Sequence, residues 1–171
     1  SRTAARDAIL RGTVTVDGAT AARPGLRVHA GQTIEVADPA ARYVSRSALK
    51  LVAALDAFAI DPAGLATLDL GASTGGFTQV LLERGAHSVT AIDVGHGQLD
   101  PALAADARVR SIEGLNARHL DRAHLNEAPA LVVADLSFIS LLQALPPALS
   151  LAAPDAWLAA LVKPQFEVGR E

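Results

Sequence analysis

Short apolar runs alternate with helix-length segments throughout residues 67–162. Runs such as LVVA at residues 131–134 are typical of strands that are buried on both faces. Asp100 followed by Pro101 is typical of a helix start, and Gly85 is typical of a helix stop. The predicted strands are residues 67–70, 89–92, 109–112, 131–134 and 158–162. The predicted helices are residues 76–84, 100–106, 117–125 and 138–145. This alternation predicts an α/β fold with a doubly wound, mostly parallel sheet.

The first part of the chain follows a different pattern. Residues 3–11 have helical periodicity, and residues 13–16 and 32–36 have the pattern of strands. Asp17-Gly18 is typical of a hairpin turn. We predict a small α+β module, a linker and a larger domain. Their bounds are residues 1–37, 38–44 and 45–171.

Composition excludes several classes of protein. Half of the residues are hydrophobic and 19% are charged, which excludes a disordered chain. Cysteine is absent, which excludes a disulfide scaffold, a Cys-based zinc site and a thiol nucleophile. The five histidines have no paired ligand spacing, so we expect no metal. Because methionine is also absent, we expect a fragment or a processed product.

The longest uncharged run covers residues 136–154. It is about as long as a membrane span, but Pro146-Pro147 interrupts it. We interpret the run as a core helix followed by a turn.

Charge is unevenly distributed along the chain. Residues 1–46 hold seven arginines against four acidic residues, whereas residues 47–171 carry a net negative charge. A basic head on an acidic body favours a polyanionic partner, although so few arginines can also gather by chance. The residues expected to contact phosphates are Arg2, Arg6, Arg11, Arg23, Arg27 and Arg46.

Only two of the fifteen basic residues are lysines, Lys50 and Lys163. Arginine stays charged in proteins whereas lysine can lose its proton, so positions that need an amine would resist a drift towards arginine. Lys50 lies opposite the main apolar face of a helix predicted over residues 46–60, with Ser45 as its N-cap. A solvated lysine is the alternative interpretation there.

The segment DLGASTGGFT at residues 69–78 joins a predicted strand to its helix. Its glycines allow the backbone to turn sharply and to approach a ligand. The spacing is neither that of a dinucleotide fingerprint nor that of a phosphate loop. An acid two residues before the first glycine suits an adenosyl ligand without pyrophosphate, and a plain glycine-rich turn is the alternative. The residues expected to bind the ligand here are Asp69, Gly71, Ala72, Ser73, Thr74, Gly75, Gly76 and Phe77.

Further candidates follow the later strands. Asp93 stands 22 residues after Gly71, where an acid can accept hydrogen bonds from ribose hydroxyls. Adenine contacts are expected near residues 113–116, with Asn116 as the candidate. Asp135 and Lys163 follow the next two strands, so both are expected at the ligand-bearing edge of the sheet.

Five segments together resemble the TlyA/haemolysin-A family of ribosomal RNA 2′-O-methyltransferases, which have an FtsJ-like catalytic domain. The segments are YVSRSALKL at 43–51, DLGASTGGFT at 69–78, DVGHGQL at 93–99, DLSFISL at 135–141 and LVKPQFE at 161–167. The resemblance covers nearly the whole chain. Residues 1–37 are similar to an S4-type RNA-binding module that lacks its first helix.

The resemblance implies a class I methyltransferase fold, S-adenosylmethionine (SAM) as cofactor, ribosomal RNA as partner and a cytoplasmic location. It also implies a Lys-Asp-Lys-Glu catalytic set, of which Lys50, Asp135 and Lys163 match the first three members. The fourth member and the last two strands would follow Glu171, and Glu167 is not in the matching motif. Ser-Ala at residues 47–48 stands where the family has Gly-Gly.

The implied reaction is methyl transfer to a ribose 2′-hydroxyl, with cytidine as the expected nucleotide. Lys163 would take the hydroxyl proton, while Lys50 and Asp135 would hold the hydroxyl. Phe138 is expected to stack on the target base, with core packing as the alternative. Three other functions stay open: a membrane-acting haemolysin, a catalytically incomplete RNA- or SAM-binding module, and a small-molecule methyltransferase.

Overall fold

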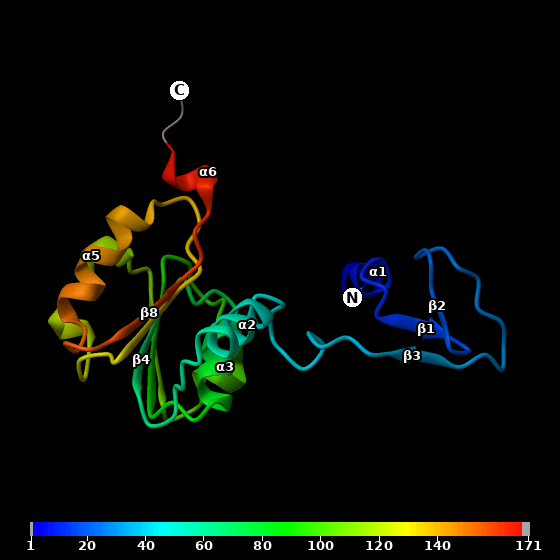
Figure 1. Ribbon diagram of the computed structural model, residues 1–171, viewed down its shortest axis with the longest axis horizontal. Coiled ribbons are helices and arrows are strands. Elements are labelled where there is room, and N and C mark those ends of the chain that lie inside the picture. The colour runs from blue at the N-terminus through cyan, green and yellow to red at the C-terminus, as the bar shows by residue number, and fades with distance from the viewer. Residues whose placement is uncertain (1, 169–171) are drawn as a thin grey trace. The chain divides into compact units, whose positions relative to one another are not determined.

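The computed structural model describes residues 2–168. The chain divides into two compact units, with the boundary between Arg42 and Tyr43 (Figure 1). Helices and strands are numbered in chain order, and each unit is described by itself.

The first unit combines one helix with a three-stranded antiparallel sheet of order β2-β1-β3. Its elements are α1 (Arg2–Leu10), β1 (Val14–Val16), β2 (Ala19–Thr20) and β3 (Ile34–Val36). Its core is small and consists of Ala8, Val14, Val16 and Ala21. Asp38 forms an ion pair with Arg11, and Ala40 is buried. Residues 38–42, which were expected to be a linker, therefore belong to this unit in the structure.

The second unit contains a parallel sheet of five strands in the order β6-β5-β4-β7-β8. Its strands are β4 (Ala66–Leu70), β5 (Ser88–Asp93), β6 (Val109–Glu113), β7 (Leu131–Ala134) and β8 (Trp157–Ala160). All five predicted strands are confirmed. Leu70 aligns with Ile92 on one side and with Ala134 on the other. The residues that follow, Asp93 and Asp135, therefore stand together at the carboxyl edge of the sheet.

Helices cover both faces of this sheet, as in a doubly wound fold (Figure 1). The remaining elements are α2 (Ala48–Phe58), α3 (Gly76–Glu83), α4 (Pro101–Ala104), η1 (Ala117–His119), η2 (Arg122–His124), α5 (Leu141–Leu151) and α6 (Pro164–Glu167). Leu51 and Leu55 of α2 pack with α3 against one face, and Ala144 and Ala148 of α5 pack against the other. Side chains of β7 enter both clusters, so that strand is apolar throughout.

Two helix predictions are corrected by the structure. Residues 117–125 form two short 3₁₀ turns, because the side chains of Asn116 and Asp121 each cap a separate start. Residues 138–145 were predicted to be helical with a break at Pro146-Pro147, yet α5 runs from Leu141 to Leu151 with both prolines inside it. Because proline has no N–H, the carbonyls of Leu142 and Gln143 lose their usual donors four residues on, but both residues are exposed and water can satisfy them.

The helix that carries Lys50 also begins later than predicted. Its N-cap is Ser47, and Ser45 instead accepts a hydrogen bond from the Ser47 N–H at 3.2 Å. The helix ends where Ala59 adopts a left-handed conformation, before Asp61.

Candidate active site

The loop between β4 and α3 lies against the segment that follows β7. Gly71 has φ +83°, and a Cβ there would lie 3.0 Å from the carbonyl oxygen of Asp135 and 3.1 Å from Cδ2 of Leu136. The loop approaches its neighbour this closely because residue 71 has no side chain. The Ser73 N–H donates to Oδ2 of Asp93 at 2.8 Å, which ties the loop to the end of β5.

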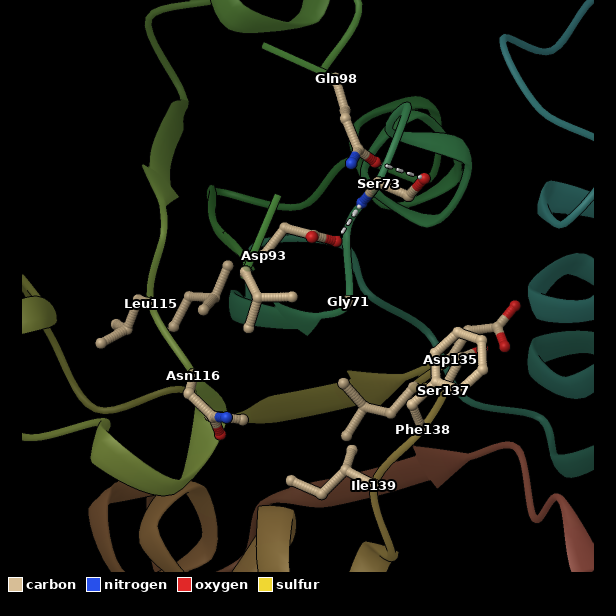
Figure 2. Close-up of a pocket in the computed structure, with 14 residues that line it drawn as sticks. Gly71, Ser73, Asp93, Gln98, Leu115, Asn116, Asp135, Ser137, Phe138 and Ile139 are labelled. Carbon is tan, nitrogen blue, oxygen red and sulfur yellow. Dashed lines mark hydrogen bonds between the residues drawn. The ribbon is translucent and has the colours of Figure 1, made fainter. Parts of the chain in front are cut away.

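A cavity of about 500 Å³ opens at this edge, and we call it the glycine-loop cavity (Figure 2). Its walls come from the β4–α3 loop, the end of β5, the segment after β6 and the segment after β7. Its lining includes Gly71, Ser73, Asp93, Gln98, Leu115, Asn116, Asp135, Phe138 and Ile139. The cavity therefore lies at the point where the strand order reverses between β4 and β7, which is the usual ligand position in such sheets.

Asp93 is held in one orientation at the wall of this cavity. Its Oδ2 accepts the N–H of Ser73 and its Oδ1 accepts the N–H of Gly95 at 2.7 Å. A carboxylate oxygen can accept more than one hydrogen bond, so Asp93 keeps capacity for a ligand.

Asp69 does not line the cavity. Its side chain is fully buried below the glycine loop, where Oδ2 accepts the hydroxyl of Thr78 at 2.7 Å. Its Oδ1 has no hydrogen-bond partner among the described residues. Burial raises the pKa of Asp69 to about 7; hydrogen bonds from Thr78 oppose the rise, whereas the charges of Asp135 and Asp93 add to it.

Three residues that are distant in sequence meet beside the cavity, and we call them the amine cluster: Lys50, Asp135 and Lys163. Lys50 Nζ lies 3.1 Å from Oδ2 of Asp135, and Lys163 Nζ lies 2.7 Å from Oδ1. Lys163 Nζ also donates to Oγ of Ser137 at 2.8 Å. Burial raises the pKa of Asp135, but the ammonium groups of Lys163 and Lys50 outweigh it and hold that pKa below its usual value. Asp135 is therefore a carboxylate at neutral pH.

A smaller cavity of about 210 Å³ lies between the amine cluster and the glycine loop. The loop contributes Ala72, Ser73 and Phe77, and the cluster contributes Asp135 and Lys163. The two cavities share Gly71, Ser73, Asp135 and Ser137 in their walls, so they are adjacent.

The sequence of the second unit identifies its family. A family model described as FtsJ-like methyltransferase matches residues 43–171. The chain belongs to this family.

Individual relatives agree with that assignment. The chain is 50% identical over 171 residues to the 16S/23S rRNA (cytidine-2′-O)-methyltransferase TlyA of Mycobacterium tuberculosis, covering 99% of this chain and 64% of the relative. It is 42% identical to hemolysin A of Brachyspira hyodysenteriae, covering 99% of this chain and 71% of that protein. The chain thus spans less than two thirds of the TlyA protein.

Two solved structures have the same fold. One is a candidate hemolysin from Streptococcus thermophilus, with a TM-score of 0.78 and 39% identity, covering 99% of this chain and 63% of that one. The other is a candidate hemolysin from Lactococcus lactis, with a TM-score of 0.73 and 45% identity, covering 76% and 63%.

Within this FtsJ-like unit, some predicted ligand residues lie away from both cavities. Thr74, Gly75 and Gly76 line neither one. A Cβ at Gly76 would lie 2.5 Å from Oγ of Ser47, and one at Gly75 would lie 2.4 Å from Leu103. These two glycines therefore allow the loop to pack tightly against the protein itself.

The predicted RNA contacts divide between the units. Arg46 belongs to the second unit, and the other five predicted arginines are exposed residues of the first: Arg2, Arg6, Arg11, Arg23 and Arg27. Phe138 is 92% exposed, has φ +65° and places its ring 5.3 Å from that of Phe166. The alternative prediction, that Phe138 packs in the core, is therefore wrong.

Sequence reasoning missed four polar residues at the two cavities. Gln98 accepts the hydroxyl of Ser73 at 3.2 Å and lines the glycine-loop cavity. Ser45, Ser47 and Ser137 line the smaller cavity. All four lie within the five segments that carry the family resemblance. Their position inside these motifs was therefore the sequence signal that could have identified them.

Neither a membrane span nor a metal cluster is found within residues 2–168. No described helix is long and apolar enough to cross a bilayer. No group of three or more potential metal ligands occurs in the same residues.

Proposed function

We propose that this protein transfers a methyl group from SAM to a ribose 2′-hydroxyl of ribosomal RNA, with cytidine as the target nucleotide. The observation that carries the proposal is the amine cluster, two lysines on one carboxylate, beside a cavity of cofactor size. The relationship to the M. tuberculosis TlyA protein supports the substrate class.

The residues around the glycine-loop cavity fit this cofactor. A cavity of about 500 Å³ is in the range of small-molecule sites. The charges of Asp93 and Asp135 each repel a charge on Asp69, one oxygen of which is buried without a hydrogen-bond partner among the described residues. A ligand that carries a sulfonium and an ammonium group would offset this repulsion. Asp93 and Asn116 would hold the nucleoside part, and the backbone at Gly71 and Ser73 would hold the rest.

The amine cluster can perform the proton transfer. When bound, SAM supplies a methyl group that is activated by its sulfonium. Once its ammonium group had released a proton to solvent, the Lys163 amine would accept the proton of the attacking hydroxyl; its side chain is 22% exposed and is fixed by Asp135 and Ser137. Lys50, whose side chain is 49% exposed, would hold the hydroxyl with Asp135.

The basic first unit would bind the RNA. Five exposed arginines can contact phosphates without reading sequence, and such binding weakens steeply with salt. We infer that this unit is an S4-like module and that Arg46 adds a contact from the second unit. Phe138 would stack on the target base, since its ring is exposed beside Asp135 and Ser137. A ribosomal substrate implies a cytoplasmic location.

The test has two arms. Titration calorimetry with SAM and S-adenosylhomocysteine should give saturable heat. Incubation of ribosomal subunits with methyl-labelled SAM should give alkali-resistant label at one ribose, since a 2′-O-methyl group blocks strand cleavage there. Binding without any transfer would favour a catalytically incomplete module, and transfer to free nucleosides alone would favour a small-molecule enzyme.

A haemolysin is the second candidate, because one relative and two solved structures carry that description. Release of dye from liposomes by the purified protein would support it. Methyl transfer without leakage would exclude it for this chain.

A further inference from the structure

The chain that follows Lys163 turns back to meet the start of α5. Glu167, the last residue of α6, accepts the hydroxyl of Ser140 through Oε2 at 2.7 Å. Its Oε1 accepts the N–H of Leu141 at 2.9 Å. Ser140 is the N-cap of α5 and Leu141 is its first residue. Both carboxylate oxygens thus join the segment that carries Lys163 to the segment that carries Asp135.

We call residues 163–168 the lysine arm. The last backbone hydrogen bond to β7 before the arm is that of the Leu161 N–H to the Ala134 carbonyl, at 2.9 Å. Val162, which precedes the arm, and Val168, its last residue, are 66% and 70% exposed, so apolar burial does not fix the arm at either end. Its position depends on side-chain contacts with residues 135–141.

Three such contacts exist. Lys163 Nζ meets Asp135 and Ser137, and Phe166 packs on the exposed ring of Phe138. The bidentate carboxylate of Glu167 is the third, and it is the contact farthest along the arm from Lys163. A carboxylate at a helix N-terminus is favoured both by the free N–H groups and by the helix dipole.

Helix capping alone does not require Glu167. Oγ of Ser140 accepts the N–H of Leu142 at 3.1 Å, so α5 keeps its own N-cap without the carboxylate. The distinctive effect of Glu167 is therefore on the arm and not on the helix.

We propose that Glu167 is a positioning residue, which holds the lysine arm so that the Lys163 amine stays on Asp135 and Ser137. Its effect on methyl transfer rests on the proposed function, with Lys163 as the proton acceptor. A displacement of about 1 Å at such a group costs on the order of 10²-fold in rate.

The experiment uses the fact that the chain has only two lysines. Reductive methylation with labelled formaldehyde, read peptide by peptide, gives a separate rate for each amine. In the wild type, Lys163 should react more slowly than Lys50, because its side chain is less exposed. Glu167→Ala should raise the Lys163 rate several-fold and leave the Lys50 rate unchanged. It should lower kcat about 10²-fold with the Kd for SAM unchanged.

Glu167→Gln is the conservative variant. Its amide oxygen can accept the Leu141 N–H and its NH₂ can donate to Oγ of Ser140. It should therefore restore both the slow labelling of Lys163 and most of the transfer.

Glu127→Ala is the matched control, because that carboxylate also accepts a serine hydroxyl, from Ser88 at 2.8 Å, away from both cavities. It should change neither the labelling rates nor kcat. If Lys163 in Glu167→Ala were methylated at the wild-type rate, the proposal would be overturned. A lower melting temperature with that unchanged rate would mean that Glu167 serves stability alone. Labelling requires no turnover, so an inactive wild type would count against the proposed function alone.

Discussion

The glycine-loop cavity and the amine cluster share one sheet edge, but they are held in different ways. The cavity is fixed largely by backbone: a Cβ at Gly71 would lie 3.0 Å from the Asp135 carbonyl oxygen, and the Ser73 N–H is bonded to Asp93. The cluster is fixed by side chains, two flexible lysines on one carboxylate. Residues of the cavity therefore serve the fold as well as the ligand, whereas residues of the cluster can serve chemistry alone.

Energetics support the same distinction. The exposed Lys50–Asp135 pair contributes only about 0–1 kcal/mol to stability, and loss of the less exposed Lys163 would still leave Asp135 paired with Lys50. Strain at a backbone contact or a buried carboxylate costs more, about 1–3 kcal/mol or above. Substitutions in the amine cluster should thus change the rate of methyl transfer and leave the free energy of unfolding unchanged. Substitutions around the glycine-loop cavity should change both.

Replacement of Lys163 gives the largest expected effect and tests the cluster half of the comparison. Lys163→Ala should abolish methyl transfer, and Lys163→Arg should lower it by about 10²–10⁴-fold, because arginine keeps the charge but cannot accept a proton. The Kd for SAM and the melting temperature should stay near their wild-type values, as calorimetry and thermal unfolding would measure. Turnover by Lys163→Ala would mean that another group takes the proton.

The comparison also explains which parts of the site the sequence could predict. Asp135 and Lys163 follow parallel strands, whose ends must meet, so their convergence follows from topology. The position of Lys50 does not follow from its helix, since helix geometry alone favoured a solvated lysine. It reaches Asp135 because α2 packs beside α3, where a Cβ at Gly76 would lie 2.5 Å from Oγ of Ser47.

Local spacing was informative but incomplete for the glycine loop. It placed Asp69 beside the ligand, whereas the structure buries that side chain against Thr78. Strand alternation alone cannot say which acid of a loop turns inward, because packing of the following helix decides it. The positive φ of Phe138 likewise has no sequence signal, since that conformation is uncommon for a bulky residue.

The pH dependence of stability tests the part of the comparison that concerns the glycine-loop cavity, because Asp69 is buried below its loop. Its folded-state pKa of about 7 exceeds its ordinary value of 3.8, so its contribution to stability is fully present below pH 4 and is lost as pH rises to about 7. Asp69→Asn, which mimics the protonated acid, should remove this loss. Urea unfolding at pH 5 and pH 8 should show a decline for the wild type that exceeds that of the variant by on the order of 2 kcal/mol. The lowered pKa of Asp135 acts at more acidic pH and does not enter this window. Equal declines in the two proteins would show that Asp69 is ionised across the range.

The smallest expected effect is that of an alanine at a glycine of the loop. Two glycines form a matched pair that separates the cost of a strained φ angle from the cost of crowding a neighbouring backbone. Gly71 and Gly64 both have positive φ, +83° and +73°, so alanine is strained at either position. A Cβ at Gly71 would crowd the Asp135 carbonyl and Leu136, whereas one at Gly64 would meet nothing within 4 Å. Gly71→Ala should therefore lose about 1 kcal/mol more unfolding free energy than Gly64→Ala, and it alone should weaken SAM binding. Scanning calorimetry on the two variants measures the difference in stability, and titration calorimetry measures the difference in SAM affinity. An equal loss of affinity in both would mean that the loop responds to overall stability, and the cavity would then owe its shape to the fold as a whole and not to the contact at Gly71.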